Sequence, residues 1–238
     1  MVFVLEVKEI EKKFKKSQVL NNISFCISQG EVFGLVGLNG IGKTTLIKII
    51  LNLLLQDKGE VTIFSNPNAD LKSKSLIAYL PEKFNPSPFL KGREFLELSM
   101  GYYGLDYNLQ EAEILCNQLG LKFEALDRRI SNYSKGMGQK LGLISVFLTR
   151  APLLILDEPM SGLDPSARIA LKKKLISYKA EGNSIFFSSH ILADIEEICD
   201  KIGVIHEGGL IFEGSSKEFI SKYPANSLEE SFLSAINL

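Results

Sequence analysis

Cysteine is scarce in this chain of 238 residues, which contains three cysteines and no C-x-x-C spacing. Cys26, Cys116 and Cys199 are scattered along the sequence. A disulfide framework needs a dense, even set of cysteines, and a structural zinc site needs closely spaced ligand pairs. The sequence indicates neither, and we expect three buried, reduced thiols.

An excess of charge of either sign is also missing, since 27 Lys and Arg residues balance 28 Asp and Glu residues. A protein that binds the phosphate backbone of nucleic acid usually concentrates positive charge on one surface. We therefore expect no nucleic acid among the partners of this chain. Its 45% of hydrophobic residues are sufficient for one sizeable core.

Long uninterrupted apolar runs are lacking as well. The two longest apolar stretches, near residues 46–55 and 141–156, contain Lys48 and Thr149-Arg150 respectively. A membrane-spanning helix needs about 20 consecutive apolar residues. Residues 1–8 alternate like a strand and do not have the cationic start and apolar centre of a signal peptide. We expect a chain that neither crosses a membrane nor carries a signal peptide.

A glycine-rich motif is the most informative feature that is present. Residues 37–45 read G-L-N-G-I-G-K-T-T and lie between an apolar strand pattern, 32–36, and an apolar helix pattern, 46–55. Glycines at such a turn let peptide N–H groups surround phosphate oxygens, and the helix N-terminus adds partial positive charge. Lys43 would supply charge for the β- and γ-phosphates, and Thr44 would hold Mg²⁺. The motif predicts nucleotide binding by Gly37, Asn39, Gly40, Gly42, Lys43, Thr44 and Thr45.

A second apolar run, residues 153–158, ends in Asp157 and Glu158. In parallel sheets ligands bind at the carboxyl ends of the strands, so this run delivers two acids to the ligand-binding edge. We expect Asp157 to take a Mg²⁺-linked water and Glu158 to polarise the water that attacks the γ-phosphate. Phosphoryl transfer needs this kind of positioning and charge more than it needs covalent chemistry.

Three further segments give the chain a resemblance to a known family. Residues 133–140, Y-S-K-G-M-G-Q-K, precede Asp157 where the ATP-binding cassette family carries its L-S-G-G-Q signature. They are similar to the S-K-G-M variant of exporter-type members. Residues 161–164 resemble the D-loop, and residues 227–233 resemble the S-L-E-E-x-F-L tail of the exporter branch. The resemblance to these ATPase subunits of ABC transporters covers nearly the whole chain, and it implies ATP and Mg²⁺ as cofactors.

The resemblance also implies further site residues. His190, at the end of the strand pattern 184–188, matches the switch histidine and is placed to hydrogen-bond a γ-phosphate oxygen. Phe14 stands where the family usually has an aromatic residue that stacks on adenine. Ser134 and Gly136 open the signature helix, whose N-terminal N–H groups form an anion site.

Some of these candidates have structural interpretations too. Phe14 could instead belong to the core or to a lysine-rich turn. Asp164, a D-loop residue, would with Pro165 also make a good helix start in any protein. Glu82 replaces the Gln that most of the family uses to reach Mg²⁺ and the attacking water, and it could be a ligand and catalytic group or a solvated carboxylate. His206 lies in a turn-rich segment and is interpreted as structural.

The expected fold class is α/β, a P-loop NTPase core with a mixed or parallel sheet, an N-terminal antiparallel β layer and an inserted helical subdomain. The core and β layer span 1–83 and 149–215, the helical subdomain 84–148, and a C-terminal tail 216–238. The sequence pattern predicts antiparallel strands at 3–7, 23–27 and 61–64, with a break at Asn21-Asn22, and a hairpin at 204–212. It predicts helices at 93–103, 109–119, 137–148 and 172–180.

The resemblance implies a function in which ATP joins two cassettes, the P-loop of one facing Ser134 and Gly136 of the other. The partners would be a second copy or a related cassette, and a separate transmembrane permease near residues 80–90. Phe84 and Phe89 would either contact that permease or belong to the subdomain core. The chain would lie in the cytoplasm at the inner face of the membrane and hydrolyse ATP for export.

Two other functions stay open. One is a soluble ABC-type ATPase that acts on ribosomes or DNA, although the second cassette, coiled-coil insertion or basic arm usual in such proteins is not visible. The other is a nucleotide-gated interaction module that does not hydrolyse ATP, which the presence of Glu158 and His190 disfavours. The transported substrate is not indicated, because the membrane partner would select it.

Overall fold

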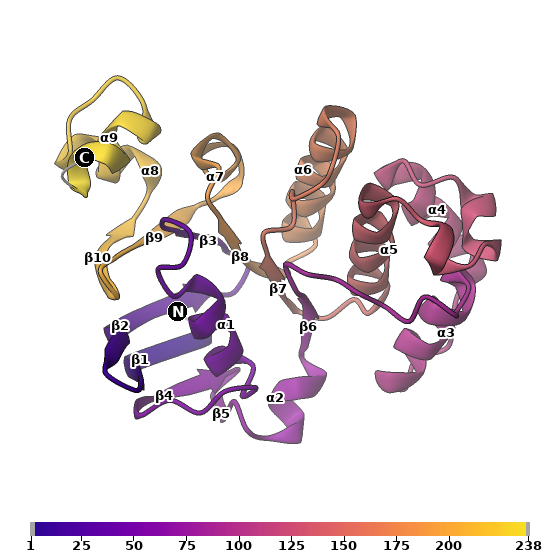
Figure 1. The fold of residues 1–238 in the computed structure, drawn as a ribbon, viewed down its shortest axis with the longest axis horizontal. Coiled ribbons are helices and arrows are strands. Elements are labelled where there is room, and N and C mark those ends of the chain that lie inside the picture. The colour runs from indigo at the N-terminus through magenta and orange to yellow at the C-terminus, as the bar shows by residue number, and fades with distance from the viewer. Residues whose placement is uncertain (1–2, 237–238) are drawn as a thin grey trace.

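The computed structural model describes residues 3–236, and its centre is a six-stranded sheet (Figure 1). The strands are β3 (Val32–Val36), β6 (Ile77–Leu80), β7 (Leu153–Asp157), β8 (Ser184–Ser189), β9 (Lys201–His206) and β10 (Gly209–Gly214). Their order is β10-β9-β3-β8-β7-β6, and all neighbours are parallel except β9 and β10. The order confirms the predicted fold class and the hairpin, and it places β8 between the glycine-rich-loop strand and the strand that ends at Asp157.

Helices cover both faces of this sheet, so β3, β7 and β8 are buried at every residue, as expected for parallel strands. Neighbouring residues of β8 point to opposite faces. Phe186 packs into the core that α1 (Lys43–Ile50) shares with the N-terminal strands. Phe187 packs into the core that contains α6 (Pro165–Ala180) and α7 (Leu192–Ile198).

The predicted antiparallel layer is confirmed, and its strands are longer than expected. It contains β1 (Phe3–Phe14), β2 (Ser17–Ser28), β4 (Lys58–Ile63) and β5 (Asn66–Pro67), in the order β2-β1-β4-β5. The break expected at Asn21-Asn22 is wrong, because both residues lie within β2. Ile10 pairs with Ile23 and Lys12 with Leu20, so two residues of β2 oppose one of β1 in a bulge, with φ 51° at Asn22.

The helical subdomain lies beside β6 and β7 and contains α3, α4 and α5 (Figure 1). The bounds are α3 (Gly92–Tyr102), α4 (Leu109–Leu119) and α5 (Lys135–Leu148), with short 3₁₀ turns at Phe123–Asp127 and Ile130–Asn132. The three predicted helices are confirmed, and α4 has the expected bounds. Helix α5 begins earlier than expected because the Ser134 side chain accepts the Met137 N–H at 3.2 Å. Helix α6 also begins earlier, at Pro165, because Asp164 accepts the Ala167 N–H at 2.9 Å.

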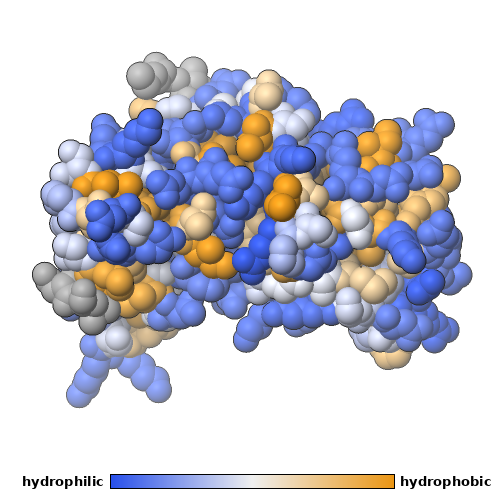
Figure 2. All heavy atoms as spheres, turned by 90° about the horizontal axis from the view of Figure 1, so that it is seen from above, coloured by the Kyte–Doolittle hydropathy of each residue, from blue (hydrophilic) through white to orange (hydrophobic). Residues whose placement is uncertain are grey.

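The rest of the chain forms α2 (Leu71–Ser75) and two helices of the C-terminal tail, α8 (Ser216–Lys222) and α9 (Leu228–Ala235). Helix α9 packs against α7 and α8, which joins the tail to the core. Residues 1–2 and 237–238 of the predicted domain lie outside the described residues. In the stretch 3–236, no helix is both long and apolar enough to span a bilayer. The face seen in Figure 2 carries its apolar residues as small patches among hydrophilic ones.

The expectation of three buried thiols is correct only for Cys116. Cys26 is half-buried because β2 alternates, and its neighbours Phe25 and Ile27 take the core face. Cys199 directly follows α7 and is half-buried as well. All three are free, and burial raises the pKa of each thiol, to about 11 for Cys116.

Helix α5 packs closely on the edge of the sheet at Gly142. A Cβ atom there would lie 2.7 Å from Leu80 Cδ1 and 3.0 Å from Phe84 Cδ1. We expect Gly142→Ala to lower the free energy of unfolding by about 1–2 kcal/mol, since overpacking outweighs the gain in helix propensity. Gly101→Ala in α3 is the matched control, because a Cβ at that position meets no atom within 4 Å. Urea unfolding of both variants tests this, and equal stability of the two would contradict it.

Candidate functional site

A cavity of about 450 Å³ opens at the carboxyl ends of β3, β7 and β8. It brings together ten of the residues that sequence analysis selected. Its lining consists of Asn39, Gly40, Gly42, Lys43, Thr44, Thr45, Glu82, Asp157, Glu158, Ser161 and His190.

One wall of the cavity is the loop that joins β3 to α1. Gly40 and Gly42 have φ of 81° and 117°, values that glycine adopts at little cost. The first turn of α1 carries no acidic side chain, and Gly42 makes no side-chain cap. Peptide N–H groups at the start of a helix have no partner within the helix. The loop and the helix start therefore form a surface suited to an anion such as phosphate.

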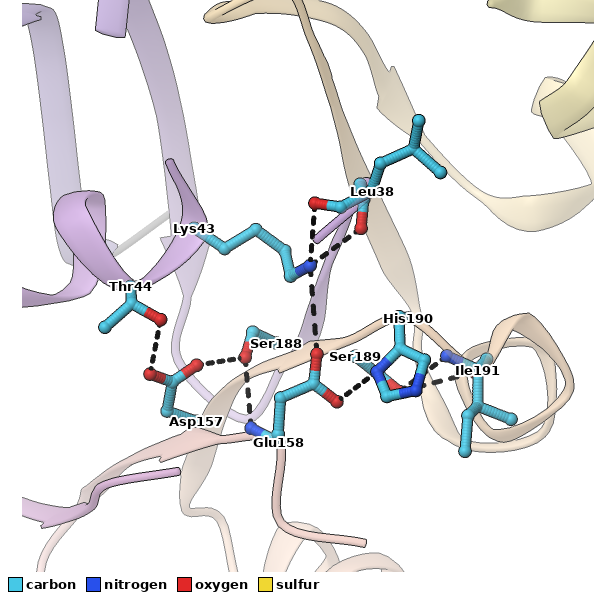
Figure 3. Close-up of polar contacts among 10 residues, drawn as sticks. Leu38, Lys43, Thr44, Asp157, Glu158, Ser188, Ser189, His190 and Ile191 are labelled. Atoms are coloured by element: carbon cyan, nitrogen blue, oxygen red, sulfur yellow. Dashed lines mark hydrogen bonds and ion pairs between the residues drawn. The ribbon is translucent and has the colours of Figure 1, made fainter. Parts of the chain in front are cut away.

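The ammonium of Lys43 lies at the centre of this loop (Figure 3). Its Nζ donates to the Gly37 carbonyl at 2.7 Å and to the Leu38 carbonyl at 3.3 Å. It also lies 3.8 Å from Glu158 Oε1, and its side chain is only 7% exposed. Burial lowers the pKa of Lys43, and nearby carboxylates, chiefly Glu158, oppose that shift. The loop thus fixes a cation beside the helix start.

The carboxylate of Asp157 is bonded on both oxygens. Thr44 Oγ1 donates to Oδ2 at 2.9 Å, and Ser188 Oγ donates to Oδ1 at 2.5 Å. Within residues 3–236, no three His, Cys, Asp or Glu side chains converge to hold a metal ion. The adjacent oxygens of Thr44 and Asp157 nevertheless fit Mg²⁺, which usually takes one or two protein ligands and completes its shell with water and phosphate.

Glu158 and His190 form a pair at the mouth of the cavity. His190 Nδ1 lies 2.8 Å from Glu158 Oε2. The other carboxylate oxygen, Oε1, is buried and has no hydrogen-bond partner among the described residues. A carboxylate with one oxygen held by a hydrogen bond, and the other near the Lys43 ammonium but not hydrogen-bonded, can orient and polarise a water molecule.

The other five predicted site residues do not line this cavity: Phe14, Gly37, Ser134, Gly136 and Asp164. Gly37 nevertheless contacts it through Lys43, whose Nζ donates to the Gly37 carbonyl. Phe14 is 45% exposed beside the turn between β1 and β2, so it is not a core residue. Lys12 Nζ lies 5.6 Å from the centre of its ring, in agreement with a lysine-rich turn. The adenine-stacking role of Phe14 stays a prediction.

Ser134 lines a second cavity of about 680 Å³, between the helical subdomain and the segment after β6. Glu82 and Ser161 line both cavities. Gly136 lies against the segment after β7, since a Cβ there would be 3.0 Å from the Gly162 carbonyl oxygen. Asp164 caps α6, as its structural interpretation predicts, and hydrogen bonds from Ser166 and from the Ala167 N–H lower its pKa to about 2.

The two aromatic residues near the second cavity have different environments. Phe84 is half-buried and packs edge-on against Phe95, with ring centroids 5.4 Å apart, so it belongs to the subdomain core. Phe89 is 81% exposed and is available for contact with a partner.

Sequence analysis did not select Ser188 or Ser161. Ser161 was noted only as part of the D-loop segment. Ser188 lies in β8 two residues before His190, which directly follows the strand, and side chains at that spacing in an extended segment share one face. This spacing from His190, the switch-histidine candidate, was the signal in the sequence that could have selected Ser188.

Comparison with known proteins gives consistent matches. The family model described as ABC transporter matches residues 20–161. An uncharacterized ABC transporter ATP-binding protein of Synechocystis is 37% identical over 91% of this chain, which spans 64% of that protein's length. The Nod factor export ATP-binding protein I of Burkholderia lata is 33% identical over 91% of this chain and 72% of its own length. A solved ATP-binding subunit of an ABC transporter superposes with a TM-score of 0.90 at 33% identity, covering 98% of this chain and 99% of that one.

Proposed function

The chain belongs to the family of ABC transporter ATP-binding proteins, and on that premise we propose that it hydrolyses ATP to energise a separate membrane subunit. The main support for this proposal is the arrangement of Glu158 and His190 beside Lys43. It places a carboxylate that can polarise water next to the cation proposed to bind phosphate. The name of the Burkholderia relative supports export as the direction of transport. A module without hydrolysis would not need the Glu158–His190 pair.

In this proposal the two walls of the cavity have different tasks. The start of α1 and Lys43 would hold the phosphates, and Thr44 with Asp157 would hold Mg²⁺. Bound Mg²⁺ supplies positive charge that neutralises the phosphate oxygens. Glu158 orients the attacking water and accepts its proton, while His190 fixes the Glu158 carboxylate. In its protonated form His190 would also donate from Nε2 to a γ-phosphate oxygen.

A dimer is the proposed working form. Ser134 and Gly136 stand at the start of α5, a helix of 14 residues, yet they do not line the cavity that holds Lys43. The start of α5 would therefore serve the ATP of a second cassette, either an identical copy or a related one. An ATP molecule between two positive helix ends binds the closed dimer better than the open one, which is the differential affinity that drives closure.

The second cavity is the proposed contact for the membrane subunit. It is lined by residues 82–86 and Pro88 together with the signature segment, and the exposed Phe89 is next in the chain. Docking there would place the chain in the cytoplasm at the inner face of the membrane. The permease would then determine which substrate is transported.

Glu158→Gln tests hydrolysis directly. The amide keeps the shape of the side chain and loses its basicity, so kcat should fall by about 100-fold or more, the usual contribution of a general base. The Kd for Mg-ATP should stay within about threefold, because the phosphate-holding groups are unchanged. Phosphate release and equilibrium ATP binding measure the two effects. Glu113→Gln, on the exposed side of α4, is the control, and wild-type turnover in Glu158→Gln would refute the assignment.

Mixing two inactive variants tests the shared site. Ser134→Arg blocks the start of α5, and Lys43→Ala removes the phosphate cation, so each variant should be inactive alone. A mixed dimer would contain one site built from two intact halves, so a substantial part of the ATPase activity should return. If mixed dimers form, as shown by co-purification of two tags, and activity does not return, then the two chains do not share their sites.

Two variants of Glu82 test whether its carboxylate contacts Mg²⁺ or is only solvated. Glu82→Gln keeps an oxygen ligand for Mg²⁺, so hydrolysis should stay within about tenfold of wild type, or roughly 1.4 kcal/mol in barrier height. Glu82→Ala removes the oxygen that lines both cavities, so stimulation of ATPase activity by the membrane subunit should be lost. Equal stimulation in wild type, Gln and Ala would show that Glu82 takes no part in the site.

A further inference from the structure

Ser188 makes two contacts that link the acidic residues at the end of β7. It is fully buried in β8, next to β7 in the sheet. Its hydroxyl donates to Asp157 Oδ1 at 2.5 Å and accepts the peptide N–H of Glu158 at 3.1 Å (Figure 3). One hydroxyl therefore bonds the side chain of the first acid and the backbone of the second.

The backbone of Glu158 needs such a partner. Its φ of 50° is in the left-handed region, which costs free energy for any residue with a Cβ atom. Such a conformation persists only where the surroundings hold it. Ser188 accepts the Glu158 N–H at this bend, so it stabilises the turn that aims the Glu158 side chain into the cavity.

The residue that directly follows β8 holds Glu158 at a second point. His190, two residues after Ser188, contacts the Glu158 carboxylate at 2.8 Å. Ser188 thus holds the backbone of Glu158, while His190 holds its side chain. Lys43, the proposed phosphate-binding cation, has two further partners in the Gly37 and Leu38 carbonyls, which neither Ser188 nor His190 contacts.

From these contacts we propose that Ser188 is a positioning residue for ATP hydrolysis, which sets the orientation of Asp157 and Glu158 without touching the nucleotide. The inference rests on the proposed ATPase function. A purely structural serine would satisfy a buried carboxylate and affect stability alone. A positioning serine would affect kcat much more than KM, because the groups that hold phosphate stay in place.

Ser188→Ala should lower kcat by about 10- to 100-fold while the KM for ATP changes by less than about threefold. Ser184→Ala is the matched control, because Ser184 lies on the same strand, is also fully buried and bonds backbone groups at the far end. Its kcat should remain within about twofold of wild type. Ser188→Thr keeps the hydroxyl and should restore most of the lost kcat, provided that urea unfolding shows the added methyl group to be accommodated.

Amide hydrogen exchange gives a readout that does not depend on activity. The Glu158 N–H should exchange at least about tenfold faster in Ser188→Ala than in wild type or in Ser184→Ala, because its acceptor is gone. Unchanged Glu158 exchange, equal kcat losses in both Ala variants, a rise in KM alone, or failure of Ser188→Ala to fold where Ser184→Ala folds would overturn the inference. A wild-type chain that neither binds nor hydrolyses ATP would overturn the proposed function itself.

Discussion

The buried carboxylate of Asp157 is the interaction on which the rest of the site depends. A carboxylate removed from water must be hydrogen-bonded or paired, or it becomes neutral. Here the hydroxyl of Thr44 from α1 satisfies one oxygen, and the hydroxyl of Ser188 from β8 satisfies the other. Both elements must therefore lie next to the end of β7. The strand order with β8 between β3 and β7 meets this requirement, and it also brings His190 within reach of Glu158.

Elements whose ends are specified locally could be predicted from the sequence. Helix α4 has the expected bounds because Asn108 accepts the Glu111 N–H at its start and Gly120 adopts a left-handed conformation at its end. The β1–β2 pair was predicted too short for a different reason. Asn21 and Asn22 resemble a turn locally, but pairing with β1 absorbs them as a bulge. Cross-strand pairing is a tertiary interaction, and a pattern along one strand does not contain it.

Contacts within the site that depend on tertiary structure could not be predicted either. The glycine-rich motif and the Asp157–Glu158 pair each lie on a short segment, so the sequence alone could select Lys43, Thr44 and both acids. The contacts of Ser188 with Asp157, the last residue of β7, and with Glu158, which follows it, depend on which strand neighbours β7. The sequence pattern predicts parallel strands without their order, so it could not assign that contact. The partial burial of Phe84 likewise depends on where Phe95 of α3 packs.

The segment that follows β7 is held from two sides, and this connects the two cavities. On one side, β8 fixes Asp157 and Glu158. On the other side, Gln139 of α5 donates to the Pro159 carbonyl at 3.1 Å, and both groups are buried. Close-packed protein interiors transmit displacement because they contain little free volume. A shift of α5 relative to the sheet must therefore break the Gln139 bond or move the residue next to Glu158, so the second cavity and the proposed hydrolytic site are not mechanically independent.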